Sequence, residues 1–84
     1  MSKYYCPCCG YQTLTELPGN YEICEICFWE DDPVQLAQPD LAGGANHVSL
    51  RQAQQNFEQF GASEQRVLAF VRRPTTTDKR QSRF

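Results

Sequence analysis

The apolar positions of the second half of the chain follow the period of a helix. An apolar residue recurs every third or fourth position, at Leu50, Ala53, Phe57 and Phe60. This spacing places them on one face of an amphipathic helix over residues 49–60. Ser49 is suited to the N-cap with Gln52 three residues later, and Gly61 is suited to a left-handed C-terminal stop. We therefore predict a capped helix that packs its apolar face against the rest of the domain.

A second apolar group follows at once. It consists of Val67, Leu68, Phe70 and Val71. Ser63 could cap a helix over about residues 64–72, and Pro74 should end it because proline cannot continue a helix. Residues 75–84 contain threonines and scattered charges without hydrophobic periodicity. We expect this last segment to fray.

The first part of the chain has the pattern of short strands. Residues 11–15 are rich in β-branched and aromatic side chains, and residues 21–23 alternate apolar and polar. The turn signal at residues 18–20 lies between them, so we predict a hairpin made of these two strands. Residues 31–46 look irregular, apart from one helical turn that begins at Pro33.

The cysteines supply the chemistry. Cys6 and Cys9 form one C-x-x-C pair, Cys24 and Cys27 form a second, and fourteen residues separate Cys9 from Cys24. Such a turn lets two thiolates converge on one ion, and two pairs across a hairpin are typical of a zinc ribbon. An 84-residue domain also gains little folding free energy from its core alone, so it needs further stabilisation such as a bound metal ion. We predict an α+β fold, a small zinc-ribbon-like β-hairpin with one or two C-terminal helices, that holds one Zn²⁺.

Cys8 is the fifth cysteine and lies outside both pairs. It could replace Cys6 or Cys9 as a metal ligand, although cysteines this close converge less well on one ion. It could also be a small buried apolar residue, or a reactive thiol whose pKa is lowered by nearby amides and metal.

Charge divides the chain into two parts. The formal net charge is −2, but residues 1–64 carry two basic and nine acidic side chains, whereas residues 65–84 carry six basic and one acidic. Such a basic segment can be a solvated end or an arm that binds phosphate groups. The candidates for phosphate binding are Arg72, Arg73, Lys79, Arg80 and Arg83.

An aromatic and acidic run follows the second cysteine pair. Its members are Trp29, Glu30, Asp31 and Asp32. We interpret them as a candidate surface for a partner protein, because one of two neighbours in an extended segment is exposed. The alternatives are a core role for the tryptophan and a capping role at Pro33 for an acid. His47 is the single histidine, and its position indicates a loop residue more than a ligand or a general base.

These motifs together resemble the small, mostly bacterial cysteine-rich CPCC proteins. The matching stretches are Cys6-Pro7-Cys8-Cys9-Gly10-Tyr11, Tyr21-Glu22-Ile23-Cys24, Cys27-Phe28-Trp29-Glu30-Asp31-Asp32 and Gly43-Gly44-Ala45-Asn46. The resemblance covers about residues 4–74 and departs at Glu25, where the family pattern has proline. It implies a cysteine-rich domain without known catalytic residues. The association of some members with toxin–immunity loci implies a role in protein binding.

The length is that of one domain, which we place at residues 1–74 with a basic tail at 75–84. No apolar run is long enough for a membrane span, and residues 1–6 lack the apolar core of a secretory signal. We expect a cytoplasmic, non-catalytic zinc module that binds a protein partner and no membrane. The alternatives are a nucleic-acid-binding ribbon that uses the basic tail, and a rubredoxin-like iron protein in which Cys8 resolves a disulfide.

Overall fold

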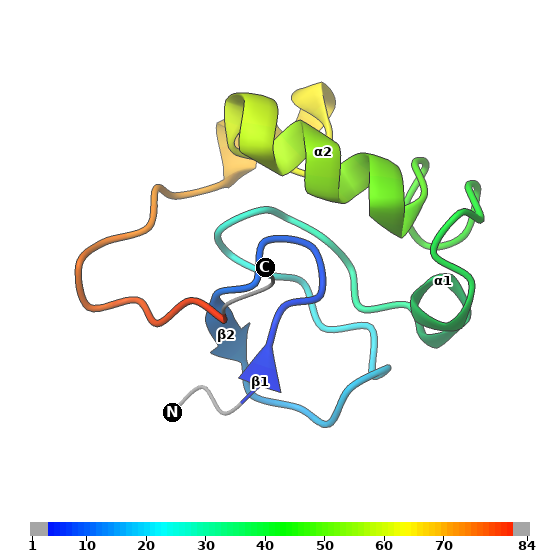
Figure 1. Ribbon diagram of the computed structural model, residues 1–84, viewed down its shortest axis with the longest axis horizontal. Coiled ribbons are helices and arrows are strands. Elements are labelled where there is room, and N and C mark those ends of the chain that lie inside the picture. Colours follow the sequence, from blue (N-terminus) through cyan, green and yellow to red (C-terminus); the bar gives the residue numbers. More distant parts are fainter. Residues whose placement is uncertain (1–3, 82–84) are drawn as a thin grey trace.

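The computed structural model describes residues 4–81 and confirms a small α+β domain. The elements in chain order are β1 (Tyr4–Tyr5), β2 (Gln12–Leu14), α1 (Pro33–Ala37), α2 (Leu50–Phe60) and the 3₁₀ helix η1 (Gln65–Phe70). In Figure 1, α2 lies along one side of the looped cysteine-rich region, and the two strands lie on the other side. Most of the first third is loop, so the cysteine region depends on contacts between loops for its shape.

The strands pair differently from the predicted hairpin. β1 pairs antiparallel with β2, with Tyr4 opposite Leu14, so the hairpin encloses the first cysteine pair. The predicted pairing of residues 11–15 with residues 21–23 is wrong. Tyr21 adopts a left-handed φ of 61°, which interrupts any strand there, and Ile23 forms an isolated bridge with Glu30. Each cysteine pair therefore turns the chain back onto its own flanking residues.

A carboxylate connects the two segments that the prediction had paired. The Glu22 side chain accepts hydrogen bonds from the backbone N–H groups of Thr15 and Glu16, at 2.9 and 2.8 Å from Oε1. This contact holds the 15–22 loop closed without a strand ladder.

The short helix at Pro33 is confirmed, with the proline in its first turn and Asp32 as its N-cap. The fully buried Gln35 organises the loop after it. Its Nε2 donates to the carbonyls of Leu41 at 3.0 Å and Val48 at 3.1 Å, and its Oε1 accepts from Asn46 Nδ2 at 2.9 Å. One buried amide thus joins three parts of this loop, in addition to the backbone hydrogen bond from the N–H of Gly43 to the carbonyl of His47.

The long helix forms as the sequence predicts. Ser49 Oγ accepts from the N–H of Gln52 at 3.1 Å, and Gly61 ends α2 with a φ of 88°. The buried face consists of Leu50, Ala53 and Phe57. These three belong to the same cluster as the five cysteines, Leu14, Ile26 and Trp29. The core therefore lies between α2 and the two cysteine loops.

The second predicted helix is shorter and tighter than expected. A 3₁₀ helix spans residues 65–70, with Glu64 and not Ser63 at its N-cap position. Ser63 is buried, and its N–H donates to the carbonyl of Cys27 at 2.8 Å, so it is committed to the second cysteine loop. Of the four predicted apolar anchors only Val67 is buried, whereas Leu68 is 43% and Phe70 67% exposed.

The C-terminal segment returns to the first cysteine loop. The N–H of Gln12 donates to the carbonyl oxygen of Lys79 at 2.8 Å. The N–H of Gln81 donates to the carbonyl oxygen of Gly10 at 2.7 Å. Arg80 lies between them in an isolated bridge with Tyr11. Instead of fraying, residues 79–81 thus pair with residues 10–12, and in Figure 1 the segment runs from the end of η1 back to β2. Within residues 4–81, no helix has the length and apolar character needed to cross a membrane.

Candidate metal centre

The two C-x-x-C loops have the same backbone design. In the first loop, the N–H of Gly10 donates to the carbonyl oxygen of Cys6 at 2.8 Å. In the second loop, the N–H of Phe28 donates to the carbonyl oxygen of Cys24 at 2.7 Å. Gly10 and Phe28 follow the last cysteine of each pair, and both adopt left-handed φ angles of 80° and 68°. Glycine accepts this conformation without cost, whereas phenylalanine is strained by it.

Four sulfur atoms converge between these loops. The Sγ atoms of Cys6, Cys9, Cys24 and Cys27 all lie within 4.8 Å of one another, and all four residues are buried. The Sγ atoms of Cys6 and Cys27 are 3.5 Å apart, and those of Cys9 and Cys24 are 3.7 Å apart. A tetrahedral ion with metal–sulfur bonds of about 2.3 Å requires sulfur separations of about 3.8 Å. The four cysteines are thus arranged as a site that could hold one metal ion.

The electrostatics of the site favour a cation. Burial raises the pKa of the Cys6 thiol and that of the Cys27 thiol above the ordinary cysteine value. Hydrogen bonds from the neighbouring cysteines, foremost Cys27, hold the pKa of the Cys24 thiol far below the ordinary cysteine value. Four buried thiolates would repel one another, and a divalent cation removes that cost by binding them directly.

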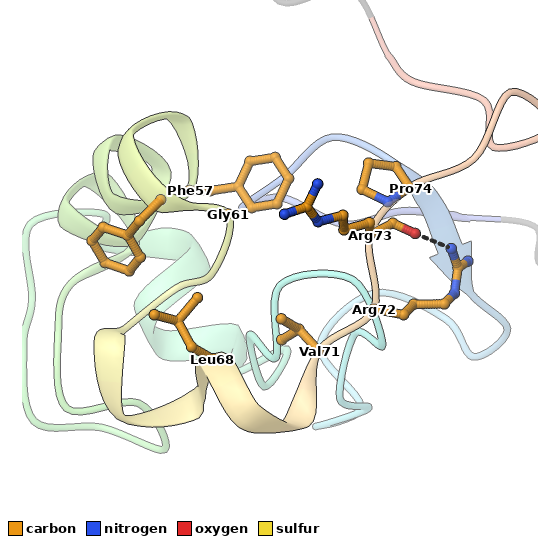
Figure 2. A pocket seen from close by; sticks show the side chains of 8 residues that line it. Phe57, Gly61, Leu68, Val71, Arg72, Arg73 and Pro74 are labelled. Carbon is orange, nitrogen blue, oxygen red and sulfur yellow. Dashed lines mark hydrogen bonds between the residues drawn. The ribbon is translucent and has the colours of Figure 1, made fainter.

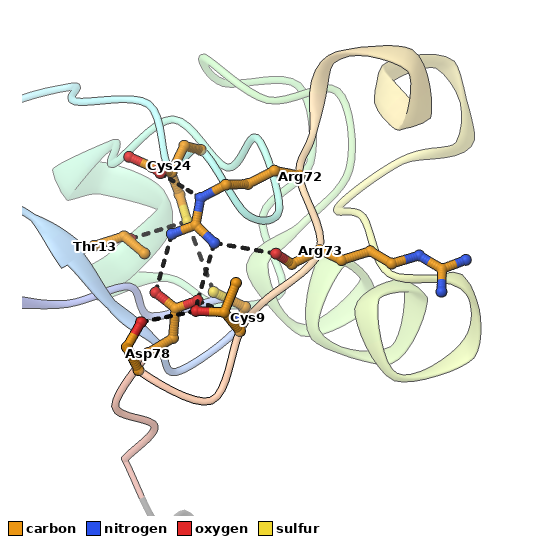
Figure 3. A network of polar contacts seen from close by, with 9 residues as sticks. Cys9, Thr13, Cys24, Arg72, Arg73 and Asp78 are labelled. Atoms are coloured by element: carbon orange, nitrogen blue, oxygen red, sulfur yellow. Dashed lines mark hydrogen bonds and ion pairs between the residues drawn. The ribbon is translucent and has the colours of Figure 1, made fainter.

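Two donors outside the ligand set point at the sulfur atoms. The Thr13 hydroxyl lies 3.0 Å from Cys24 Sγ, and the N–H of Trp29 donates to Cys27 Sγ at 3.4 Å. Figure 3 shows the Thr13 contact from β2 to the second cysteine loop. Such donors stabilise thiolates and fix their orientation toward a metal. The sequence marked Thr13 only as a strand residue, because the contact joins two segments whose pairing the pattern did not predict.

Cys8 is fully buried and is not one of the four converging residues. It neighbours the site through a side-chain contact with Cys27. Its burial agrees with the interpretation as a small apolar residue beside the metal loop. The same burial opposes its interpretation as an accessible reactive thiol.

The acidic and aromatic run does not form an exposed surface. Trp29 is fully buried in the core, and Asp31 and Asp32 are also buried, so the prediction of a partner surface is wrong for these three residues. Asp31 Oδ2 accepts from the N–H of Gly19 at 2.9 Å, and Asp32 caps α1. Glu30 is half-buried. The acids hold neighbouring loops in place, because their carboxylates satisfy backbone donors that no strand pairs.

Two of the five basic candidates for phosphate binding, Arg72 and Arg80, form ion pairs inside the molecule. Arg72 donates to both carboxylate oxygens of Asp78, at 2.9 and 3.0 Å, and also pairs with Glu25. Figure 3 shows Arg72 between Asp78 and the loop that carries Cys24. These hydrogen bonds raise the pKa of Arg72 and lower that of Asp78. Arg72 is therefore a link between the C-terminal segment and the second cysteine loop.

Arg80 has a similar internal role, since it pairs with Glu58 of α2. Arg73 and Lys79 are exposed, and Arg83 lies outside the described residues. His47 is also exposed, with Nδ1 3.8 Å from a Glu64 carboxylate oxygen, and it is not in the sulfur cluster. Arg72 and Arg80 therefore pair with acidic residues of the body, Glu25 and Glu58.

Comparison with known proteins identifies the family. The description of the matching family is cysteine-rich CPCC, and its match extends over residues 4–78, from β1 to the Asp78 that binds Arg72. Comparison with curated proteins gives no match. Because the family match spans both cysteine loops, all helices and most of the C-terminal segment, this chain belongs to the cysteine-rich CPCC family.

Proposed function

We propose that this protein is a non-catalytic zinc-binding module that works by binding a partner protein. The observation that carries the proposal is the group of four buried cysteine sulfurs within 4.8 Å of one another. Tetrahedral sites of four thiolates are typical of zinc and of iron, and we propose zinc, because closed four-cysteine sites are the usual structural zinc sites. The binding free energy of such a site would add directly to folding.

A structural role for the metal follows from the ligand set. Catalytic zinc keeps one coordination position for water or substrate, whereas four thiolates fill the tetrahedral shell. All four cysteines are buried, and α2 covers them through Ala53 and Phe57. These features support a centre that shapes two loops and takes no part in a reaction.

Protein binding is supported by the surface. Large apolar side chains that are at least a third exposed occur in many places, including Tyr5, Leu17, Tyr21, Ile23, Val34, Leu68 and Phe70. A module without a reaction acts through its surface, and apolar exposure favours protein contacts. The link of similar proteins to toxin–immunity loci makes a toxin the first class of partner to test. Unbridged cysteines suit a reducing compartment, so we place the protein in the cytoplasm.

Metal analysis of purified protein tests the proposal. We expect about one zinc per chain, retained in Cys8→Ser and lost or weakened in Cys24→Ser. Cys8→Ser is the matched control because Cys8 is buried next to the site without belonging to the four. About one iron per chain, recognised by the colour of the protein, would contradict the assignment of zinc and favour the alternative of an iron redox protein. A folded protein without any metal would overturn the proposal.

A second measurement separates protein binding from nucleic-acid binding. Because Arg72 and Arg80 are paired with carboxylates, we expect only weak binding to a labelled double-stranded or single-stranded oligonucleotide. Tight binding that falls steeply as the salt concentration increases would support nucleic-acid binding through phosphate contacts, and not protein binding, as the function.

A further inference from the structure

A pocket lies between the C-terminal end of α2 and the chain that follows η1. Its volume is about 400 Å³. The apolar part of its wall consists of Phe57, Phe60, Leu68, Val71 and Pro74. Figure 2 shows Phe57, Leu68, Val71 and Pro74 around one hollow, with α2 on one side and residues 71–74 on the other. The size falls near the lower end of ligand-binding pockets, at about 300–1,000 Å³.

One wall of this pocket carries a positive charge that pairs with no carboxylate of the described residues. In Figure 2 the guanidinium of Arg73 points across the pocket toward the end of α2 that bears Phe57 and Gly61. Within residues 4–81 no carboxylate pairs with Arg73, and no acidic residue lines the pocket. The other arginine of the wall, Arg72, is already held by Asp78 and Glu25. Arg73 is thus the group that a bound carboxylate would meet.

We propose that this pocket binds a segment of a partner protein in which an aromatic side chain stands beside a carboxylate. The inference rests on the proposed role in protein binding and names the surface that performs it. The aromatic ring would enter the apolar hollow, and the carboxylate would take the planar guanidinium of Arg73 as its donor. This surface replaces the run at Trp29–Asp32, of which three residues are buried.

The openness of the site favours a peptide over a small metabolite. Leu68 is 43% exposed and Arg73 is also exposed, so the wall is incomplete on the solvent side. A small ligand usually has most of its surface buried by its site, whereas a protein segment brings further chain to cover an open wall. The net charge of −2 does not oppose an acidic segment here, because salt screens charges beyond about 8–10 Å.

The test is a titration of the ¹⁵N-labelled, zinc-loaded full chain with two blocked tetrapeptides, followed by NMR. The first peptide has the sequence glutamate–phenylalanine–glutamate–glycine, and the second has glutamine at both acidic positions. We expect saturable shifts at the amides of Gly61, Leu68, Val71 and Arg73. The acidic peptide should bind at least about five-fold more tightly than the neutral one, because Arg73 can form a charged hydrogen-bonded contact with one of its two carboxylates.

Two variants assign the effect. Arg73→Gln should abolish the preference for the acidic peptide and leave the weaker aromatic contact. Lys79→Gln is the charge-matched control, because Lys79 is exposed in the same C-terminal segment but does not line the pocket, and it should bind as the parent does. Equal binding of both peptides, shifts at another surface, or an unchanged preference in Arg73→Gln would overturn the inference.

Zinc content and spectral dispersion are measured on the same sample. If the chain holds zinc and is folded but neither peptide binds, the pocket inference is overturned and the zinc module stands. If the folded chain holds no zinc, the proposed function fails, and the titration still decides the pocket by itself.

Discussion

Arg80 Nε donates to the backbone carbonyl of Cys9 at 3.0 Å, so a hydrogen bond joins the C-terminal segment directly to a residue of the candidate metal centre. The same guanidinium lies over the rings of Tyr11 and Phe57, at 5.0 and 5.6 Å from their centroids. It also pairs with Glu58. One side chain therefore joins the C-terminal segment, the first cysteine loop and α2.

Arg80→Ala should weaken this junction. We expect a loss of about 1–2 kcal/mol in the free energy of unfolding, from one hydrogen bond and a partly exposed cation–π contact. The transfer of zinc to an excess of chelator should become several-fold faster, because the first loop loses its cover. Denaturant unfolding of the zinc-loaded protein and a colorimetric chelator assay measure the two effects.

Arg51→Ala is the matched control for this variant. Arg51 also pairs with a carboxylate, that of Asp40, but both side chains are more than half exposed. Exposed pairs contribute little to stability, so the control should match the parent in both assays. Equal effects of the two substitutions would show that residues 79–81 do not cover the metal centre.

Local features of the sequence predicted local structure well. Ser49, Gly61 and the apolar spacing between them defined α2, because caps and helical periodicity act within a few residues. Likewise, the two C-x-x-C pairs identified the four converging sulfurs. Spacing alone is sufficient there because both ligands of each pair belong to one turn.

Relationships between distant segments were not predictable in the same way. The alternating pattern at residues 21–23 suited a strand, but Tyr21 takes a left-handed conformation and donates to the carbonyl of Asp31. The hydrophobic character of Trp29 suits a core position and a partner surface equally well. Only the packing of α2 determines that its side chain is buried. The return of residues 79–81 depends on the partner strand residues 10–12 and leaves no periodic signal.

Thr13→Val should weaken metal binding with little effect on shape. The substitution keeps the volume of the buried side chain and removes the hydroxyl that lies 3.0 Å from Cys24 Sγ. We expect the affinity for zinc to fall about ten-fold or more, as when other outer-sphere partners of metal ligands are removed. Competition with a chromophoric chelator measures it. Thr13→Ser restores the hydroxyl and should recover most of the affinity; failure to do so would assign the loss to packing.

Two adjacent glycines should respond differently to alanine. A Cβ at Gly44 would lie 2.7 Å from Asp32 Oδ2 and 2.8 Å from Gln35 Cδ, and neither neighbour can move freely. Asp32 caps α1 and accepts from the N–H of Ala45 at 2.9 Å, while Gln35 holds the following loop. We expect Gly44→Ala to cost about 2–3 kcal/mol of stability through this overpacking.

Gly43→Ala provides the comparison. Gly43 has a φ of 79° but no atom within 4 Å of a Cβ added there, so its substitution meets only backbone strain. That strain costs about 1 kcal/mol. Thermal or denaturant unfolding of both variants measures the difference. A larger loss for Gly43→Ala than for Gly44→Ala would contradict the close approach of residue 44 to Asp32 and Gln35.

Trp29 should report metal removal by its fluorescence. It is the single tryptophan of the chain, it is fully buried, and its backbone contacts both cysteines of the second loop. Its N–H donates to Cys27 Sγ, and its carbonyl accepts from the N–H of Cys24 at 3.0 Å. If zinc holds the two loops together, chelation should expose the indole and move its emission to longer wavelength, and added zinc should reverse the change. Emission that stays constant while the metal is lost would mean that the core, with Leu50 and Phe57 against the cysteines, is stable without the ion.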